Sequence, residues 1–501
     1  MALAATLVRR GAAAFPDRTA VHCGDDSLTF AEVNDRANLI AHRLAAHEVV
    51  KGTQVALLVN NGLDSIPMEF AAIKAGLVRV PLNARLSLDE HVDMLAGSHT
   101  SVVVADAALA DRAAELAERI PGLRTFALAD LVAPSVKPVG EPDVVLEAED
   151  PTLLLYTSGT TGKLKAVVHT QGNYGAICSN ILANLLDPQP DSVMLHAASL
   201  IHASGTFVLP YWVRGGASAI LPGFEPTAFA EAIATYRVTE INLVPTMFAM
   251  LHDSGALNGA DLSSLRKVIY GASPMPRPVL RRSIEVFGPI LRQYYGQTEA
   301  PLCIAVLDEH AHADESLWGS CGMPSTDVDL RLLDEDGQEI APGEIGEITL
   351  RAPFRMLGYF EADELNAQTQ TADGWLRTRD LARFDDRGYL HLVDRTSDMI
   401  ITGGYNVYPR EVEDALASHP AVAECAVVGA PDEKWVEAVT AFVTLRAGAT
   451  ASEGELIEHV RAQIAAHKAP KSVRFVDAIP KSAVGKILRR ALRQPLWEES
   501  R

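Results

Sequence analysis

The chain of 501 residues is too long for one ordinary core, and at roughly 100–200 residues per domain it predicts about two to four structural units. Its 48% hydrophobic and 22% charged residues are typical of a folded globular protein. The formal net charge of −20 argues against a general nucleic-acid-binding protein, because phosphate contacts require clustered Lys and Arg.

The N-terminal residues and the cysteines bear on the compartment. Arg9 and Arg10 follow the apolar start of the chain, whereas a signal peptide carries its charge before the apolar run. No uninterrupted apolar stretch has the length of a membrane span. The five cysteines are scattered and form no CxxC pair, which disfavours a disulfide framework and a zinc site. We therefore expect a cytoplasmic protein without a membrane span.

The first part of the chain alternates between helical and strand patterns. Residues 28–46 have apolar positions at helical spacing after Thr29, a plausible N-cap, and residues 65–76 read as a helix closed by Gly76. Buried strands are expected at 55–60, 78–83, 193–197, 217–223, 241–245 and 267–271. This alternation predicts parallel sheets flanked by helices.

A loop rich in hydrogen-bond donors, Tyr156–Lys163 (YTSGTTGK), follows the probable buried strand TLLLY. Its glycines let backbone N–H groups approach phosphate oxygens, and its hydroxyls and Lys163 add further donors. It is not a Walker loop, because that motif requires Gly at 157 and Ser or Thr at 164. The residues of the loop alone leave a solvated strand-to-strand turn as an equal alternative.

The pattern of apolar residues and turn signals changes twice after about residue 325. Short alternating runs around Asp336-Gly337 and Pro342-Gly343, with a last strand at 389–395, predict a small antiparallel barrel over 326–394. Beyond residue 399, a helix at 410–419, strands at 423–431 and 438–445, and a helix at 453–467 predict a small α+β unit. A short connection at 395–398 would act as a hinge.

Five motifs in order along the chain resemble one family. They are residues 156–165, Gly271-Ala272-Ser273 with Tyr294–Glu299, Thr378–Asp380 with Arg395, Gly403-Gly404, and Pro480–Lys486. Over essentially the whole chain they resemble the adenylate-forming superfamily of acyl-CoA synthetases, peptide-synthetase adenylation domains and luciferases.

The resemblance implies a role for each motif residue. Tyr295 would stack on adenine, Thr298 would contact the α-phosphate, and Glu299 would hold Mg²⁺. Asp380 and Arg395 would bind the ribose, Gly404 would line a pantetheine tunnel, and Lys486 would contact the carboxylate and phosphate oxygens during adenylation. The full set expected to bind nucleotide or coenzyme A is Thr157, Ser158, Gly159, Thr160, Thr161, Gly162, Lys163, Gly271, Ala272, Ser273, Tyr295, Gly296, Asp380, Arg395 and Gly404.

The chain departs from the family pattern at several positions. Leu164 and Ala166 stand where Pro and Gly are usual, and Arg379 and Val436 also stand in place of Gly. Ser397 occupies the hinge position, which is commonly Asp or Lys.

The function that the resemblance implies is Mg·ATP-dependent conversion of a carboxylic acid to an acyl-adenylate, with pyrophosphate released, followed by transfer to coenzyme A. It also implies an N-terminal domain (1–394), a hinge (395–398) and a mobile C-terminal domain (399–501) that rotates between the two steps. Two alternatives stay open: delivery to a carrier-protein phosphopantetheine, and an inactive nucleotide-binding homologue. Retention of Lys486, Glu299 and Asp380 argues against inactivity. A homodimer is left open.

The acid is described only by its class. His202 stands where the family often has an aromatic-His pair lining the acyl pocket, with Ile201 in the aromatic place. The expected walls of this pocket are Phe207, Val244, Gly271 and Leu302. Because no charged residue enters this set, a largely apolar monocarboxylic acid is favoured.

Overall fold

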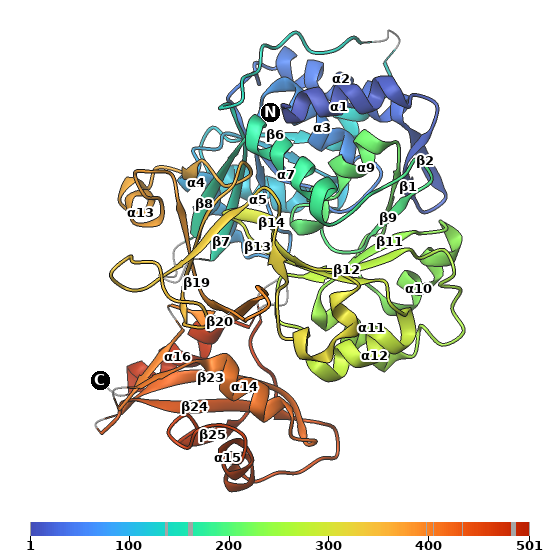
Figure 1. The fold of residues 1–501 in the computed structure, drawn as a ribbon. Helices are drawn as coiled ribbons and strands as arrows, with labels where there is room; N and C mark the ends of the chain where they lie inside the picture. Colours follow the sequence, from blue (N-terminus) through green and yellow to red (C-terminus); the bar gives the residue numbers. More distant parts are fainter. Residues whose placement is uncertain are drawn as a thin grey trace. The chain divides into compact units, whose positions relative to one another are not determined.

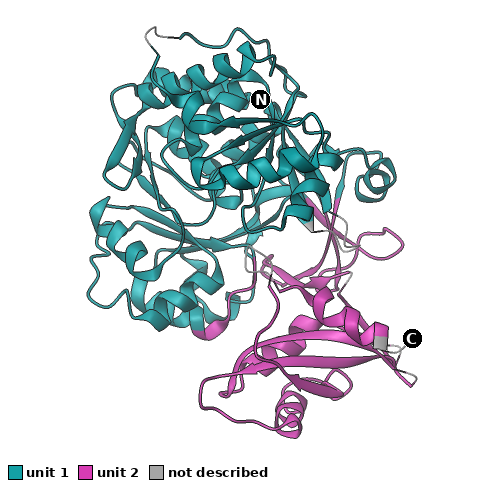
Figure 2. Cartoon of the chain, turned by 180° about the vertical axis from the view of Figure 1, so that it is seen from behind, with its two compact units in different colours: residues 1–272, 279–329, 350–376 teal, residues 273–278, 330–349, 377–501 magenta. Residues whose placement is uncertain are grey.

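Residues 2–135, 139–158, 164–396, 398–403, 405–432, 434–481 and 487–499 are described in the computed structural model. The chain divides into two compact units (Figure 2). Unit 1 comprises residues 1–272, 279–329 and 350–376, and unit 2 comprises residues 273–278, 330–349 and 377–501. The domain boundaries expected from the sequence follow a different partition and stay a prediction.

A seven-stranded sheet of unit 1 contains the hairpin that carries the predicted phosphate loop. Its strand order is β18-β8-β7-β4-β3-β5-β6. The run from β7 through β4, β3 and β5 to β6 pairs in parallel, as the alternating pattern predicts, whereas β8 runs antiparallel to both β7 and β18. The strands are β3 (Gln54–Leu58), β4 (Val78–Pro81), β5 (Val102–Ala105), β6 (Arg124–Ala127), β7 (Pro151–Ser158), β8 (Leu164–Thr170) and β18 (Gly358–Tyr359).

A nine-stranded sheet forms the other half of unit 1, in the order β15-β14-β13-β12-β11-β9-β10-β1-β2. Its inner strands from β13 to β1 are parallel, and β2, β14 and β15 add antiparallel edges. The strands are β1 (Thr19–Cys23), β2 (Asp26–Thr29), β9 (Val193–His196), β10 (Ala217–Ile220), β11 (Glu240–Leu243), β12 (Lys267–Gly271), β13 (Leu291–Gln297), β14 (Ala300–Leu307) and β15 (Met323–Pro324). The strands predicted between 193 and 271 are confirmed.

Helices pack around these sheets, with α1, α2 and α3 side by side (Figure 1). Thr29 caps α2 through a reciprocal bond with Glu32, and Gly76 ends α3 with φ +68°, so both predicted ends are confirmed. No helix in the described part of the chain is long and apolar enough to cross a membrane. The helices wholly or mostly in unit 1 are α1 (Ala4–Ala14), α2 (Phe30–Ala46), α3 (Ser65–Ala75), α4 (Leu88–Gly97), α5 (Ala110–Arg119), α6 (Leu128–Val132), α7 (Gln171–Asn184), α8 (Ala203–Thr206), α9 (Val208–Arg214), α10 (Pro226–Thr235), α11 (Pro245–Ser254), α12 (Arg277–Phe287) and α13 (Asp363–Thr369), with short 3₁₀ turns η1 (Ala107–Leu109), η2 (Ala311–Ala313) and η3 (Glu315–Leu317).

The region predicted as a small barrel contains a four-stranded sheet, in the order β16-β17-β19-β20. Its strands are β16 (Asp329–Leu333), β17 (Gly346–Arg351), β19 (Leu376–Phe384) and β20 (Leu390–Arg395). The turn expected at Gly337 is present, with φ +78° and a bond from the Gly337 N–H to the Asp334 carbonyl. Closure of this sheet into a barrel is not confirmed, because barrel closure depends on pairing of distant edges that local patterns do not specify.

The last part of the chain is an α+β unit, as predicted. Its sheet has the order β22-β21-β24-β23, with β25 parallel to β24. Alternate residues of β23 and β24 face two separate cores, one including Val427 and Val443 and one including Val428 and Phe442. The elements are β21 (Ile400–Thr402), β22 (Tyr405–Val407), β23 (Val422–Asp432), β24 (Val436–Leu445), β25 (Ser472–Phe475), α14 (Pro409–Ala417), α15 (Glu453–Arg461) and α16 (Arg489–Glu499).

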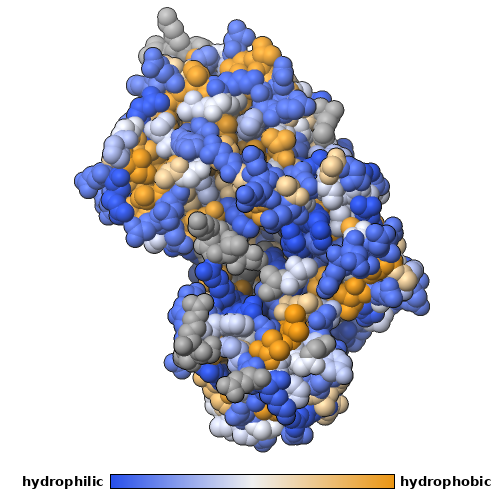
Figure 3. Space-filling view, turned by 90° about the vertical axis from the view of Figure 1, so that its left-hand side faces the viewer, coloured by the Kyte–Doolittle hydropathy of each residue, from blue (hydrophilic) through white to orange (hydrophobic). Residues whose placement is uncertain are grey.

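The helix expected over 453–467 is shorter than predicted, because α15 ends at Arg461 and turns follow it. Its apolar periodicity continues past this end to Ile464, which packs against the same core as Leu456 and Val460. The pattern of burial therefore extends beyond the helix, and periodicity alone overestimates its length. On the face of the molecule in Figure 3, hydrophilic residues predominate and apolar residues form small patches.

Candidate active site

The predicted phosphate loop lies at the end of a regular hairpin. Thr157 pairs with Lys165 and Ser158 pairs with Leu164, so β7 and β8 are in register up to the loop. The buried strand expected before the loop is therefore present. The loop residues Gly159, Thr160, Thr161, Gly162 and Lys163 lie outside the described residues.

The predicted adenine and metal segment lies where β13 turns into β14. The Tyr295 side chain is buried, and Thr298 and Glu299 are half-buried in the turn between the two strands. A Cβ atom on Gly296 would lie 2.3 Å from the Leu302 carbonyl oxygen, so only glycine fits at this position. The sequence therefore brings an aromatic ring, a hydroxyl and a carboxylate together on one short segment.

Two residues that the sequence analysis missed hold this turn. The His169 ring nitrogen Nε2 lies 2.9 Å from the Thr298 carbonyl oxygen, and the Tyr359 hydroxyl donates to Glu299 Oε1 at 2.7 Å. Burial lowers the pKa of His169 to about 4, so the ring is neutral at pH 7. Because a carbonyl only accepts, Nε2 must carry the proton. Neither residue could be found by spacing, since each comes from a strand distant in the chain.

The carboxylate of Glu299 fits the needs of a magnesium ion. Oε1 accepts from Tyr359, while no described residue donates a hydrogen bond to Oε2. Among the described residues, no group of three or more His, Cys, Asp and Glu side chains could form a metal site by itself. Mg²⁺ is commonly held by one or two carboxylates together with substrate phosphates, which is compatible with this single acid.

The predicted acyl-pocket residues lie around the start of α8 and the end of β12. His202 precedes α8, and its Nε2 lies 3.2 Å from Nδ2 of Asn83, a third residue that the sequence did not point to. Phe207 is fully buried and packs edge-on against Tyr294, with ring centroids 6.0 Å apart.

Gly271 allows a close approach in this region, because a Cβ there would lie 2.5 Å from the Tyr294 carbonyl oxygen. The two other expected wall residues differ in burial: Leu302 is buried, and Val244, which caps α11, is half-buried. Tyr294 therefore links Phe207 to Gly271, while the acid that would fill the pocket stays a prediction.

The two residues expected to bind ribose lie together within unit 2. Asp380 and Arg395 are direct partners across β19 and β20, and Arg395 Nε lies 3.4 Å from Asp380 Oδ1. The Asp380 N–H donates to Oγ1 of Thr378 at 3.1 Å, and Asp380 itself is buried. A carboxylate has two oxygens and can accept hydrogen bonds from two neighbouring hydroxyl groups.

The remaining predicted residues are Ala272, Ser273, Ser397, Gly404 and Lys486. Ala272 has φ +69° and is exposed, and Ser273 is half-buried at the start of unit 2. The hinge residue Ser397, the tunnel glycine Gly404 and the lysine Lys486 lie outside the described residues.

Two family models match the chain. The model described as "AMP-binding enzyme" matches residues 8–360, and "AMP-binding enzyme C-terminal domain" matches residues 411–486. The chain belongs to the AMP-binding enzyme family.

Relatives support the assignment along nearly the whole length of this AMP-binding enzyme. Feruloyl-CoA synthase from an Amycolatopsis species is 39% identical over 96% of each chain. The medium/long-chain-fatty-acid–CoA ligase FadD8 of Mycobacterium tuberculosis is 37% identical over 95% of this chain and 87% of its own. The structure of o-succinylbenzoate CoA synthetase from Bacillus subtilis, in complex with the acyl-adenylate OSB-AMP, has a TM-score of 0.87 and 31% identity, with 97% of both chains covered.

Two departures of the AMP-binding enzyme from its family pattern share a backbone feature. Arg379 has φ +64° and Val436 has φ +69°, a region that favours glycine. The backbone at Arg379 is held by Glu347, whose Oε1 accepts from the Arg379 N–H at 3.0 Å. Arg377 in turn donates to Oε2 of the same carboxylate at 2.5 and 3.0 Å.

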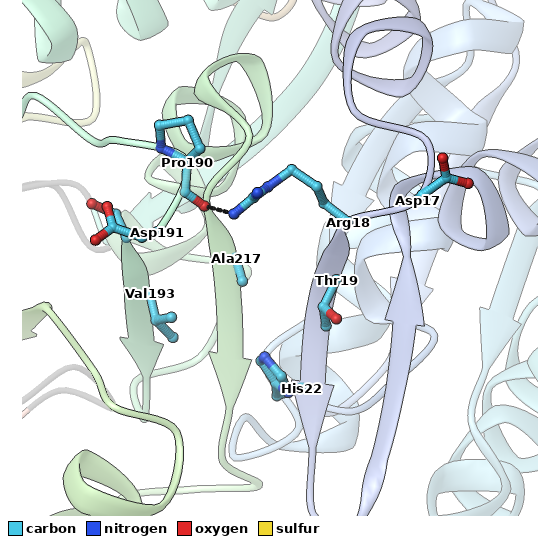
Figure 4. A pocket seen from close by; sticks show the side chains of 9 residues that line it. Asp17, Arg18, Thr19, His22, Pro190, Asp191, Val193 and Ala217 are labelled. Carbon is cyan, nitrogen blue, oxygen red and sulfur yellow. Dashed lines mark hydrogen bonds between the residues drawn. The ribbon is translucent and has the colours of Figure 1, made fainter.

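The AMP-binding enzyme also has a surface pocket of about 370 Å³ between the N-terminal hairpin and β9–β10 (Figure 4). Arg18 spans it and donates to the main-chain carbonyls of Pro190 and Gly215. Asp191, at its edge, is paired with Arg266. No motif residue lines this pocket, and Arg18 and Asp191 bind other residues of unit 1, so the pocket is separate from the candidate site.

Proposed function

We propose that this AMP-binding enzyme is an acid–thiol ligase that activates a carboxylic acid as an acyl-adenylate and transfers the acyl group to coenzyme A. The observation that carries the proposal is the anchored Thr298–Glu299 turn beside the buried Tyr295, in a chain of this family. Such a turn offers a fixed acid and hydroxyl next to an aromatic ring, which suits a metal–nucleotide substrate.

In the first step, the substrate carboxylate attacks the α-phosphorus of ATP and pyrophosphate leaves. Negative charge builds on the phosphoryl oxygens, so the protein contributes chiefly by electrostatic stabilisation and orientation. Thr298 and the hydroxyls of the 157–163 loop would donate to these oxygens, and Lys486 would supply a positive charge. Bound Mg²⁺ would be held by Glu299 and the phosphates, and would neutralise part of the charge.

The ribose would be oriented by the residues of unit 2. Asp380 would accept from both ribose hydroxyls, and Arg395, whose Nε lies 3.4 Å from Asp380 Oδ1, would reach the ribose beside it. In the second step the thiol attacks the acyl-adenylate and AMP leaves. We propose that residues 399–501 rotate about 395–398 between the steps, so that the Gly404 segment replaces Lys486.

The acid is proposed to be a largely apolar monocarboxylic acid. Phe207 and Leu302 are buried and Gly271 allows a close approach, which would suit the walls of an apolar pocket, and His202 would be its polar group. The names of the relatives support aryl or fatty acids, since one is a feruloyl-CoA synthase and another a medium/long-chain-fatty-acid–CoA ligase. A cytoplasmic location and a homodimer stay predictions.

The proposal is tested with a panel of aryl and fatty acids, assayed for pyrophosphate release with and without coenzyme A. We expect one acid to support ATP-dependent pyrophosphate release, and thioester to form only when coenzyme A is present. Lys486→Ala should lower adenylation by about 10²–10³-fold, because one preorganised charge donor contributes roughly this much to rate. The variant should still form thioester from supplied acyl-adenylate.

Three results would contradict this assignment. Equal loss in both half-reactions would make Lys486 a structural residue. Pyrophosphate release with transfer only to a phosphopantetheinyl carrier protein would replace coenzyme A as the acceptor. No pyrophosphate release with any acid would favour an inactive nucleotide-binding protein.

A further inference from the structure

One short segment fastens Glu299 at both its main chain and its side chain. The Met356 N–H donates to the Glu299 carbonyl at 2.7 Å, and the Tyr359 hydroxyl donates to Oε1 at 2.7 Å. A half-buried carboxylate on a turn would otherwise sample several rotamers. The segment at 356–359 therefore restricts both the position of the turn and the direction of the acid.

The same segment is fixed to the strand that follows the predicted phosphate loop. β18 pairs antiparallel with β8, and the N–H groups of Leu357 and Phe360 donate to the carbonyls of Val168 and Ala166 at 2.9 Å each. The Lys165 ammonium lies 5.7 Å from the centroid of the Tyr359 ring, within the range of a cation–π contact. Tyr359 thus touches Glu299 with its hydroxyl and a loop-flanking lysine with its ring face.

The chemistry of the pair explains why a tyrosine suits this position. A phenol is protonated at neutral pH, so it can donate to one carboxylate oxygen without adding charge beside a metal ion. The second oxygen, Oε2, receives no hydrogen bond from any described residue. We propose that Tyr359 is a positioning residue for adenylation, which holds one oxygen of Glu299 and presents the other to Mg²⁺. This inference rests on the proposed metal role of Glu299.

The test separates the hydroxyl from the ring. Tyr359→Phe removes the donor and keeps the ring against Lys165, and Tyr236→Phe is a matched control that removes a phenol bond to the Gly24 carbonyl elsewhere in unit 1. Mn²⁺ binding is measured by electron paramagnetic resonance of free Mn²⁺, with the non-hydrolysable analogue α,β-methylene-ATP present. Pyrophosphate release at varied Mg²⁺ and thioester formation from supplied acyl-adenylate are measured in parallel.

We expect Tyr359→Phe to weaken Mn²⁺ binding by about 3- to 10-fold, the range of one hydrogen bond. The Mg²⁺ concentration for half-maximal pyrophosphate release should rise similarly, while transfer from supplied acyl-adenylate stays near wild type. Tyr236→Phe should change none of these. In a Glu299→Gln background, Tyr359→Phe should add little further loss of Mn²⁺ affinity, because its effect passes through the carboxylate.

Two other outcomes are distinct from each other. If Glu299→Gln weakens Mn²⁺ binding but Tyr359→Phe does not, the positioning role of Tyr359 is wrong and the metal role of Glu299 stands. If neither variant changes Mn²⁺ binding, Glu299 does not hold the metal. The metal role of Glu299 and the positioning role of Tyr359 are then both wrong. The positioning role would also be wrong if Tyr359→Phe lowered Mn²⁺ affinity by the same factor in wild type and in the Glu299→Gln background.

Discussion

Arg379 and Val436 carry side chains in a backbone region that L-residues rarely adopt. A Cβ atom in the left-handed region costs roughly 1–2 kcal/mol per residue, and a β-branched residue such as Val436 is a pronounced outlier there. Arg379 lies directly between Thr378 and the proposed ribose ligand Asp380. Its unfavourable φ is held by the bond from its N–H to the buried Glu347.

Replacing Arg379 by glycine should therefore stabilise the protein relative to replacing it by alanine. Both variants remove the side chain, but only glycine removes the Cβ that opposes φ +64°. We expect the free energy of unfolding of Arg379→Gly to exceed that of Arg379→Ala by about 1 kcal/mol, measured by urea unfolding. Equal stability of the two variants would show that this backbone is not strained.

Motif residues could be found from the sequence, whereas the residues that contact them could not. Arg379 and Val436 stand out by comparison with the family pattern, and their positive φ values explain why glycine is usual there. Asp380 and Arg395 were both assigned to the ribose from ordered motifs, and this role stays a prediction, although the two side chains lie together. Tyr359, His169 and Asn83 were missed, since the contacts they make depend on strands and helices far apart in the chain.

At the scale of elements, strands β8 and β9 each carry a buried histidine near the candidate site. His169 on β8 holds the Thr298 carbonyl, and His196 at the end of β9 lies between the hydroxyls of Ser204 and Ser218. Burial lowers the pKa of His169 to about 4 and that of His196 to about 3. Both rings are therefore neutral in the folded protein at pH 7.

These histidines should make the protein sensitive to acid. Because each pKa is lower in the folded state than the ordinary 6.5, the unfolded chain binds protons first as the pH falls. The contribution of each neutral ring to the free energy of unfolding is fully present above pH 6.5. Below this pH it decreases by about 1.4 kcal/mol per pH unit, until the folded pKa is reached. At pH 5 each histidine should have removed about 2 kcal/mol.

His196→Gln isolates one of these contributions. We expect wild type to lose about 2 kcal/mol more than His196→Gln between pH 7.5 and pH 5, measured by urea unfolding at both values. Other titrating groups contribute equally to both proteins and cancel in this difference. An identical loss in the two proteins would mean that His196 titrates normally.

Elements with local signals were predicted well, and elements defined by distant pairing were not. Thr29 directly precedes α2 and caps it, and Gly76 directly follows α3 and ends it, so both signals are local in the sequence. The two-residue strand β18 has no such signal, because it exists only through pairing with β8. Barrel closure of β16, β17, β19 and β20 is a property of sheet edges, and the local turn at Gly337 does not decide it.

At the scale of the whole molecule, the proposed reaction requires one active site to perform two steps. The predicted pivot is Ser397. Its neighbour Asp398 forms an ion pair with Arg489 at the start of α16. Arg489 also binds Glu413, and Lys486 lies three residues before Arg489. A rotation about 395–398 would therefore move the lysine segment together with the α+β unit.

Ser397→Pro should trap one orientation, because proline fixes φ near −65° and restricts the preceding residue. Pyrophosphate release and thioester formation from supplied acyl-adenylate are measured separately, with Ser397→Ala as the control that keeps backbone freedom. We expect one half-reaction to fall by at least about tenfold while the other is retained. Wild-type rates in both assays would place the pivot elsewhere or make rotation unnecessary.

The N-terminal hairpin has a consequence for synthesis on the ribosome. β1 pairs with β10, and the Trp212 indole donates to the carbonyl of Val8, which lies 204 residues earlier in the chain. At about 5–20 residues per second, the nascent chain waits roughly 10–40 s before these partners emerge. During that time the side of α1 that packs on α9 is without this partner, although α2 and α3, which also contact α1, have already been synthesised. Helix α1 therefore completes its native contacts only after α9 has been synthesised, so its final packing depends on residues far along the chain.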